Sequence, residues 1–301
     1  MSLILRTENY RFSSLENYFF QPNYLEIVDD RLGAMRIHYL DEGNNKNPSV
    51  ILLHGEPTWS YLYRNMIPIL VNSGFRVIAP DLIGFGKSDK PAERKYYSYQ
   101  SHINWLRQFF MKLGILDSVL FAQDWGGLIG LRILVEEPNI FGKVMVGNTG
   151  LPTGKEDLGK DFYSWRHYSQ TSESFRIGNI IDRGTVSGLT QAEIDAYDAP
   201  FPDEKHKSGA RQFPVLVPDS ICDPEYESQK NAWKKLRVLK KPFLTCFSDR
   251  DPIMKGIEKL FIKLVPGAKG QKHFITKGAG HFLQEDASDH LARRLAEFAI
   301  V

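Results

Sequence analysis

The sequence of 301 residues predicts an α/β protein with a doubly wound, mostly parallel sheet and a helical insertion over the carboxyl edge of that sheet. The first observation is that short apolar runs alternate with amphipathic stretches of helical length. The second is that this alternation stops between about residues 151 and 218, where the sequence is polar, aromatic and rich in proline. The third is an ordinary globular composition, with 42% hydrophobic and 25% charged residues.

The predicted strands begin with a hairpin-like pair over Glu26–Glu42, which turns at Arg31-Leu32-Gly33. The later strands are short apolar or β-branched runs, as expected of strands that are buried on both faces of a parallel sheet. They are Val50–Leu53, Arg76–Ala79, Val119–Ala122, Lys143–Gly147, Phe243–Phe247 and His273–Thr276. Because ligands bind at the carboxyl ends of the strands in such sheets, we expect the functional site there.

Helical spacing separates these strands and also fills the interrupted region. Between the strands, the predicted helices are Tyr61–Ser73, Tyr99–Leu113 and Gly127–Glu136. In the interrupted region, the helix-like pieces are Asp161–Tyr168, Ser172–Asp182 and Thr190–Tyr197. We therefore predict a core domain of residues 1–150 and 219–301, and a helical cap domain of residues 151–218 inserted after the sixth strand.

Charge and cysteine usage narrow the classes of function. The 38 Lys and Arg residues nearly balance the 36 Asp and Glu residues, so neither nucleic acid nor an anionic membrane is expected as a partner. Cys222 and Cys246 form no CxxC pattern, which argues against a zinc site and a disulfide framework. No segment has 18 continuous apolar residues and Met1–Arg11 has no apolar signal core, so we expect a cytoplasmic protein. We also expect a monomer.

The run from Phe121 to Gly127 is typical of a sharp turn from a strand into a helix with a nucleophile, Asp124, at its tip. The residues two before and two after such a nucleophile must be small, and they are Ala122 and Gly126. A carboxylate nucleophile forms an ester with carbon, and that ester must then be hydrolysed. The alternative is that Asp124 only caps the helix, but a cap requires no glycine pair and no partners elsewhere in the chain.

Partners for such a nucleophile are present in the chain. His281 lies in a loop of small residues after the last predicted strand, where a general base is needed. Asp249 and Asp251, after the strand Phe243–Phe247, both qualify as the carboxylate that orients this base. We prefer Asp251, because it lies further into the loop and precedes a proline, whereas the other strand end that could carry the acid has Asn148.

Together these motifs resemble those of the haloalkane dehalogenases, a family of the α/β-hydrolase superfamily, along nearly the whole chain. The matching stretches are HGEPTWSYLYRNMIP at 54–68, RVIAPDLIGFGKSDKP at 76–91, QDWGG at 123–127, APFPD at 199–203 and GAGHFLQE at 278–285. The His-Gly-Glu-Pro run with Glu56, the acid after the seventh strand and a tryptophan in the cap together resemble the first subfamily of these enzymes.

The resemblance implies a role for each candidate residue. Asp124 would be the nucleophile, His281 the base and Asp251 the acid, while Trp125 and Trp165 would bind the halide. The backbone N–H groups of Glu56 and Trp125 would form the oxyanion hole, Glu56 would also support the hydrolytic water, and Phe162 and Phe282 would line the substrate pocket. The substrate would be a haloalkane and the products an alcohol, a halide ion and a proton, with no cofactor or metal.

Two other functions compete with this hypothesis. An epoxide hydrolase would use the same three catalytic residues, with cap tyrosines such as Tyr163, Tyr168 or Tyr197 donating a proton to the epoxide oxygen. Glu56 and Trp165 argue against it. A binding protein without catalysis, built on the same scaffold, would be expected to lack at least one catalytic partner, and here all three positions are filled.

Overall fold

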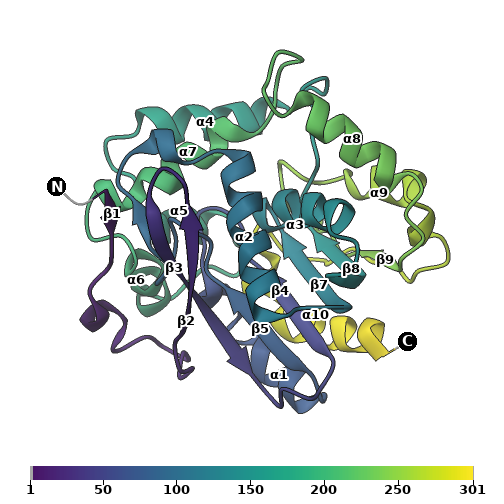
Figure 1. Ribbon diagram of the computed structural model, residues 1–301, viewed down its shortest axis with the longest axis horizontal. Coiled ribbons are helices and arrows are strands. Elements are labelled where there is room, and N and C mark those ends of the chain that lie inside the picture. Colours follow the sequence, from purple (N-terminus) through teal and green to yellow (C-terminus); the bar gives the residue numbers. More distant parts are fainter. Residues whose placement is uncertain (1–2, 301) are drawn as a thin grey trace.

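The computed structural model describes residues 3–300, and its centre is a seven-stranded sheet in the order β2-β3-β5-β4-β7-β8-β9 (Figure 1). The first two strands in this order form an antiparallel hairpin, and β3 also runs antiparallel to β5; the other neighbours are parallel. The bounds are β2 Asn23–Asp29, β3 Gly33–Glu42, β4 Ser49–Leu53, β5 Arg76–Pro80, β7 Ser118–Gln123, β8 Phe141–Gly147 and β9 Phe243–Thr245. A separate two-stranded sheet pairs β1 (Ile4–Leu5) with β6 (Lys90–Pro91).

The prediction of a doubly wound, mostly parallel sheet is confirmed, but the predicted strand His273–Thr276 is wrong. This segment runs beside β9, with the N–H groups of Phe274 and Thr276 donating to carbonyl oxygens of residues 245 and 247 at 3.2 and 2.8 Å. The backbone N–H of Thr245, however, donates to the ring Nδ1 of His273 at 3.1 Å. Because a side chain takes this donor, a regular ladder does not form.

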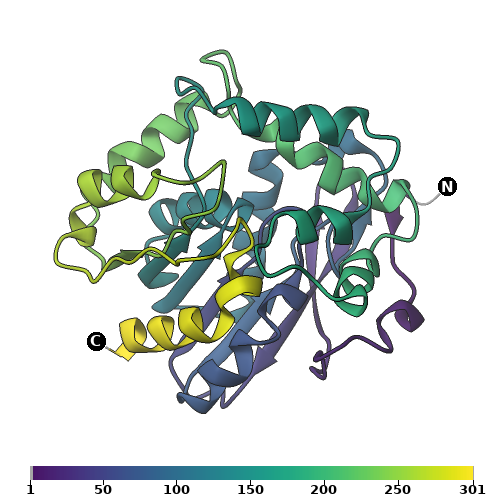
Figure 2. The same ribbon diagram turned by 180° about the vertical axis from the view of Figure 1, so that it is seen from behind.

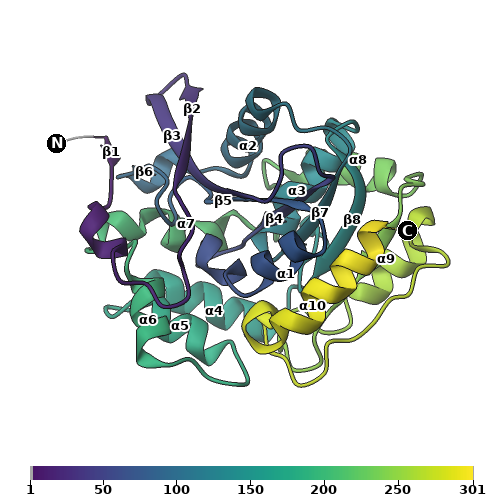
Figure 3. The same cartoon turned by 90° about the horizontal axis from the view of Figure 1, so that it is seen from below.

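Helices cover both faces of the sheet (Figure 3). One face carries α2 (Tyr99–Leu113), α3 (Trp125–Glu136) and α8 (Tyr226–Leu236), and the other carries α1 (Met66–Asn72) and α10 (Leu283–Ile300); α9 (Glu258–Leu264) packs near β9. The predicted helix Tyr61–Ser73 is divided into a 3-10 turn, Ser60–Tyr63, and α1. Pro68 explains the division, because its ring would clash with the carbonyl four residues earlier in a longer helix.

Four helices between β8 and α8 lie over one end of the sheet (Figures 1 and 2). They are α4 Lys160–Thr171, α5 Ile177–Arg183, α6 Gln191–Asp198 and α7 Ser208–Leu216. The first three overlap the predicted helical pieces, although α5 begins five residues later than the predicted piece Ser172–Asp182. Thr190 caps α6 through a capping box with Glu193. The sequence did not predict α7, because Pro214 and Pro218 suggested irregular chain; Pro214 instead stands in the last turn, where the helix ends two residues later.

A buried cluster of charges joins α6 to the rest of the molecule. The guanidinium of Arg64 donates to both carboxylate oxygens of Glu285, at the start of α10, at 2.6 and 2.9 Å. It also donates to Glu193 of α6 at 2.6 Å. The hydroxyl of Tyr197, on the same helix, donates to Glu285 as well. Because Arg64 is fully buried, each of these acceptors offsets part of the cost of burying its charge.

No helix within residues 3–300 has the length and apolarity needed to cross a membrane.

Candidate active site

The turn between β7 and α3 presents Asp124 in a strained backbone conformation. Its φ is 50° and its ψ is −127°, a region that residues with a Cβ rarely adopt. The turn fits only because its neighbours are small: a Cβ added at Gly126 would lie 2.1 Å from the carbonyl oxygen of Leu53. Although Asp124 occupies the N-cap position of α3, its side chain makes no capping hydrogen bond. The strain and the uncapped helix both argue against a purely structural aspartate.

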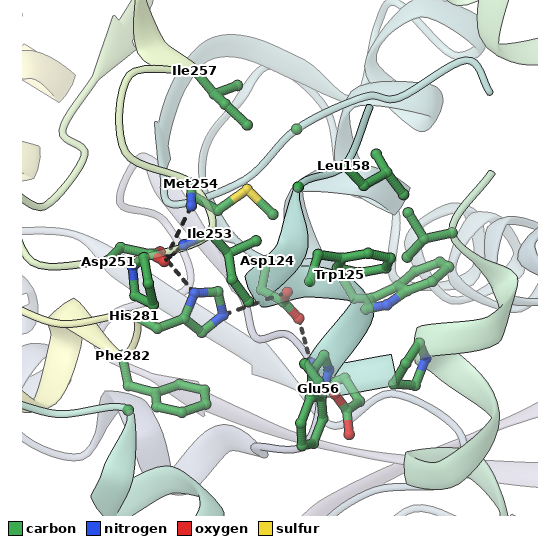
Figure 4. Close-up of a pocket in the computed structure, with 18 of the residues that line it drawn as sticks. Glu56, Asp124, Trp125, Leu158, Asp251, Ile253, Met254, Ile257, His281 and Phe282 are labelled. Atoms are coloured by element: carbon green, nitrogen blue, oxygen red, sulfur yellow. Dashed lines mark hydrogen bonds and ion pairs between the residues drawn. The ribbon is translucent and has the colours of Figure 1, made fainter. Parts of the chain in front are cut away.

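Three predicted catalytic side chains converge at this turn (Figure 4). The ring Nε2 of His281 lies 3.5 Å from Oδ2 of Asp124, and its Nδ1 lies 2.7 Å from Oδ2 of Asp251. The other oxygen of Asp251 accepts hydrogen bonds from the backbone N–H groups of Ile253 and Met254 at 2.8 and 3.1 Å. Asp249, the alternative acid, accepts from the backbone of a loop glycine at 2.8 Å and does not contact the ring.

The two carboxylates control the charge of His281. Burial alone would lower the pKa of this imidazole, but the charge of Asp251 and the hydrogen bond and charge of Asp124 raise it to about 10. Burial alone would raise the pKa of Asp251, but the charge and hydrogen bond of His281 and the two backbone donors lower it below its ordinary value. In the free site the two carboxylates therefore favour the protonated imidazole of His281. The proton stays on this ring less readily when Asp124 loses its negative charge.

The predicted oxyanion hole is occupied by the nucleophile itself. Oδ1 of Asp124 accepts a hydrogen bond of 2.7 Å from the backbone N–H of Glu56. The hydrogen bonds of the described residues include none from the backbone N–H of Trp125 to this carboxylate. Burial, and then the charge of Asp124, raise the pKa of the Glu56 carboxyl group well above its usual range, which favours the protonated form of this group. Its Oε1 is buried without a partner in the described part of the chain.

Two amide side chains that the sequence did not point to hold the base. Nδ2 of Asn148 donates to the carbonyl oxygen of Gly280 and to that of His281, at 2.9 Å each. Nε2 of Gln123 lies 3.2 Å from the carbonyl oxygen of His281 and 3.1 Å from its ring Nε2. A signal was available, since both residues are polar and stand where buried strands end. Asn148 drew attention only because it lacks a charge.

A cavity of about 670 Å³ opens above these residues. Trp125, Trp165, Phe162 and Phe282 all line it, so the structure brings together the predicted halide-binding and pocket side chains. Its remaining wall is mainly apolar, and it includes Leu128, Leu151, Leu158, Ile180, Pro214, Val217, Ile253, Met254, Ile257 and Leu260. Figure 4 shows Ile257 and Leu158 above the catalytic residues, with Asp124 between His281 and Trp125. A cavity of this size and lining suits an apolar small molecule.

The five tryptophans divide into two groups by the state of their indole N–H. Trp59, Trp105 and Trp233 are buried, and each donates its indole N–H to an oxygen of the protein, at 3.3, 2.9 and 2.7 Å. Within residues 3–300, no acceptor is found for the indole N–H of Trp125 or Trp165, the two tryptophans that line the cavity. Two donors are thus free to bind a ligand, and an indole N–H favours an anion because it can only donate.

The cap tyrosines are arranged differently. Tyr163 is 40% exposed and is not part of the cavity wall. Tyr168 lines the cavity, but its hydroxyl donates to the carbonyl oxygen of Ser174 at 3.1 Å. The hydroxyl of Tyr197 donates to Glu285 in the buried charge cluster. Tyr163 thus lies outside the cavity wall and the other two hydroxyl groups donate elsewhere, so none of the three is placed to protonate a substrate oxygen beside Asp124.

Comparisons with known proteins point to one family of enzymes. Residues 48–288 match the family model described as the alpha/beta hydrolase fold. A haloalkane dehalogenase of Psychrobacter cryohalolentis is 52% identical over 295 residues, which cover 98% of this chain and 97% of the relative. A haloalkane dehalogenase of Mycolicibacterium paratuberculosis is 47% identical and covers 97% of both chains.

Solved structures lead to the same group. A haloalkane dehalogenase of Paraglaciecola agarilytica, described as tetrameric, superposes with a TM-score of 0.87 at 33% identity, and the match covers 99% of this chain and 97% of that one. A reconstructed ancestral haloalkane dehalogenase superposes with a TM-score of 0.81 at 25% identity, covering 92% of this chain and 98% of that one.

Proposed function

Since this chain belongs to the haloalkane dehalogenases, a family of the α/β-hydrolase fold, we propose that it hydrolyses carbon–halogen bonds through an ester on Asp124. The single observation that carries the proposal is the pair of free indole N–H donors, on Trp125 and Trp165, in an apolar cavity above a strained carboxylate. A leaving halide needs donors without a full positive charge, because a cation would hold the product too tightly.

In the first step, Oδ2 of Asp124 attacks the carbon that carries the halogen. A C–O bond forms as the carbon–halogen bond breaks, and the halide leaves with the bonding electrons toward the indoles of Trp125 and Trp165. Oδ1 remains hydrogen-bonded to the backbone N–H of Glu56, which holds the carboxylate in the geometry for attack. The product of this step is an alkyl ester and a bound halide ion.

Ester formation itself prepares the second step. The ester has no negative charge, so one of the two carboxylates that raise the pKa of His281 is lost. The imidazole then gives up its proton more readily and becomes a base. Asp251 keeps Nδ1 protonated, which leaves Nε2 as the acceptor.

Hydrolysis regenerates the carboxylate. A water molecule adds to the carboxyl carbon of Asp124 and gives one proton to Nε2 of His281, while the N–H of Glu56 stabilises the oxyanion. The intermediate expels the alkoxide, which takes the proton from His281 and becomes the alcohol. The carboxyl group then loses its remaining proton, so one proton is released for each halide. Glu56 supports the water through its carboxyl group, whose Oε1 has no partner among residues 3–300.

A trapping experiment tests this mechanism. We expect His281→Phe to form the ester but not to hydrolyse it, so that intact-mass analysis after exposure to 1-bromobutane finds one butyl group per chain. The matched control is Asp124→Asn in the same assay, which should gain no mass. An unmodified His281→Phe protein, together with the absence of bromide release by the natural chain, would overturn the proposal.

The epoxide hydrolase alternative receives no support from the cap tyrosines, because the hydroxyl groups of Tyr168 and Tyr197 are engaged elsewhere. Bromide release from 1,2-dibromoethane, compared with diol formation from styrene oxide, separates the two activities.

Some expectations go beyond what the family supports, and we retain them as part of the proposal. They are membership of the first subfamily, a core of residues 1–150 and 219–301 with a cap of residues 151–218, a cytoplasmic location and a monomer. Light scattering during gel filtration tests the last, since a tetramer like that of the Paraglaciecola relative would contradict it.

A further inference from the structure

We propose that Gln123 is a positioning residue for the hydrolytic half of the reaction, because its buried amide holds the ring and the carbonyl of His281 at the same time. The inference rests on the proposed function, since it assigns a role in the second step only. Gln123 is the last residue of β7, directly before the nucleophile, so its side chain is placed by the central strand of the sheet.

The contact discriminates between the two protonation states of the base. Nε2 of Gln123 is a donor, and it lies 3.1 Å from Nε2 of His281. This approach is favourable when the ring nitrogen has a free lone pair and unfavourable when that nitrogen carries a proton. Gln123 therefore stabilises the neutral imidazole with Nδ1 protonated toward Asp251. Water must replace the amide at Nε2 when it gives up its proton, so Gln123 keeps the base neutral and in place until the water arrives.

The backbone of His281 has a second support. Nδ2 of Asn148 donates to the same carbonyl oxygen, at 2.9 Å, from the end of the neighbouring strand. A change at Gln123 thus leaves the main chain of His281 anchored and acts mainly on the ring. Gln123 is fully buried, and its Oε1 has no partner within residues 3–300, so the amide makes its hydrogen bonds through the nitrogen facing the base.

The charged and titratable groups that face His281 come from three places in the fold. Asp124 lies at the β7–α3 turn, Asp251 in the loop after β9, and Glu56 in the loop after β4. Alkylation of Asp124 removes one of these influences, and Asp251 is held by two backbone donors. Gln123 is an uncharged neighbour of Nε2, and its hydrogen bond to the carbonyl oxygen of His281 can persist through both steps.

The test separates the two chemical steps in Gln123→Met and Gln123→Glu. Rapid quenching with 1-bromobutane gives the bromide burst, which reports ester formation, and the later steady rate, which reports hydrolysis. We expect the burst rate of Gln123→Met to stay within about threefold of the natural chain and the hydrolysis rate to fall by about tenfold. Loss of a donor to the neutral ring should also move the pH midpoint of hydrolysis upward by about half a unit to one unit.

Gln123→Glu should move that midpoint further upward, because a carboxylate near Nε2 favours the protonated ring. Gln284→Met is the matched control: this glutamine is equally buried, three residues after His281, and has no amide contact with the base. We expect it to change neither the split between the steps nor the pH midpoint. Equal loss of burst and hydrolysis, or unchanged midpoints in both Gln123 variants, would overturn the proposal. If the natural chain itself releases no bromide, the proposed function fails.

Discussion

Three side chains in the site leave a usual hydrogen bond to the protein unmade, and this leaves them available for the reaction. Asp124 occupies the N-cap position of α3, but its carboxylate accepts a hydrogen bond from the backbone N–H of Glu56 and none from the helix. The indole N–H groups of Trp125 and Trp165 are free, whereas those of the other tryptophans of the described chain donate to oxygens of the protein. In a folded protein most buried donors are satisfied, so free donors in a cavity indicate a ligand.

The indole of Trp165 provides the first prediction. We expect Trp165→Phe to weaken bromide binding by about tenfold, because one donor to the anion is lost. Quenching of tryptophan fluorescence by bromide measures the dissociation constant. Trp233→Phe is the control, since its indole N–H donates to Leu151. Equal bromide affinity in Trp165→Phe and the natural chain would remove Trp165 from the halide site.

At this scale the sequence predicted residues whose chemistry is rare in their context. An aspartate between a strand and two glycines, and a histidine among small residues, are such cases. It did not point to Gln123 or Asn148, because a glutamine or an asparagine is compatible with many buried positions. Their role depends on the meeting of strand ends with a loop more than 130 positions away in the chain.

Two sets of polar contacts join elements of the fold close to the catalytic residues. The cluster around Arg64 links α6 to the first turn of α10, which directly follows the loop of His281. The loop after β9 contributes both the acid and part of the cavity wall: the backbone of Ile253 and Met254 binds Asp251, while their side chains line the cavity. Both contacts bring the cap or the substrate close to the catalytic groups.

Loss of the cation at Arg64 should destabilise the protein strongly. Arg64→Met would leave Glu285, which is nearly buried, without its partner, at a cost of about 3–5 kcal/mol in the free energy of unfolding. Urea unfolding followed by circular dichroism measures the change. Arg293→Met, which breaks an exposed ion pair with Asp289, should change the free energy of unfolding far less, because water already solvates both charges. A similar effect of both substitutions would show that the cluster does not stabilise the fold.

The loop after β9 should set the length of substrate that is accepted. We expect the kcat/KM of the natural chain to rise by up to about fourfold for each methylene group from 1-bromopropane to 1-bromohexane, because each group is buried in the apolar cavity. Met254→Trp should remove most of this rise and leave 1-bromopropane within about twofold.

Bromide release over this series provides the measurement. Ile262→Trp, on the outer part of α9 where Ile262 is 38% exposed, controls for the added bulk. A steep rise that persists in Met254→Trp would place the alkyl chain elsewhere in the cavity.

The whole molecule contains buried histidines whose titration affects folding. His102, on α2, packs against the rings of Tyr97, Trp105 and Phe213, and its Nε2 has no partner in the described chain. Burial, and then the charge of His54, lower the pKa of His102 to about 3. The unfolded chain takes up a proton below about pH 6.5, whereas the folded protein does so only near pH 3. Stability is therefore complete above pH 6.5 and falls as the pH drops toward 3.

His102→Leu should remove this part of the acid sensitivity. Between pH 7.5 and 5, the natural chain should lose about 2 kcal/mol more of its free energy of unfolding than the variant does. Urea unfolding at the two pH values measures the difference. The exposed His290, changed to Leu, should leave the loss as it is in the natural chain. If His102→Leu and His290→Leu respond to acid alike, His102 is charged in the folded protein.

At the scale of the fold, the alternation of apolar runs and helices predicted the sheet, and the central strands agree with it closely. The exceptions have local causes that pattern alone does not reveal. The ring of His273 accepts the backbone N–H of Thr245, so that segment does not form a regular ladder with β9. Pro68 divides a predicted helix. The helix α7 was not predicted because Pro214 suggested irregular chain, whereas the last turn of a helix can accommodate this proline.

The loop after β9 both holds Asp251 and lines the cavity, and this affects directed evolution of the enzyme. A library that randomises residues 253–257 to change the substrate would also sample the backbone positions that hold Asp251, so many of its members would lose activity regardless of fit. Leu158, just before α4, and Phe162, in its first turn, line the same cavity and are not hydrogen-bonded to the catalytic groups. Variation there offers a route to new substrates in which binding and turnover change separately.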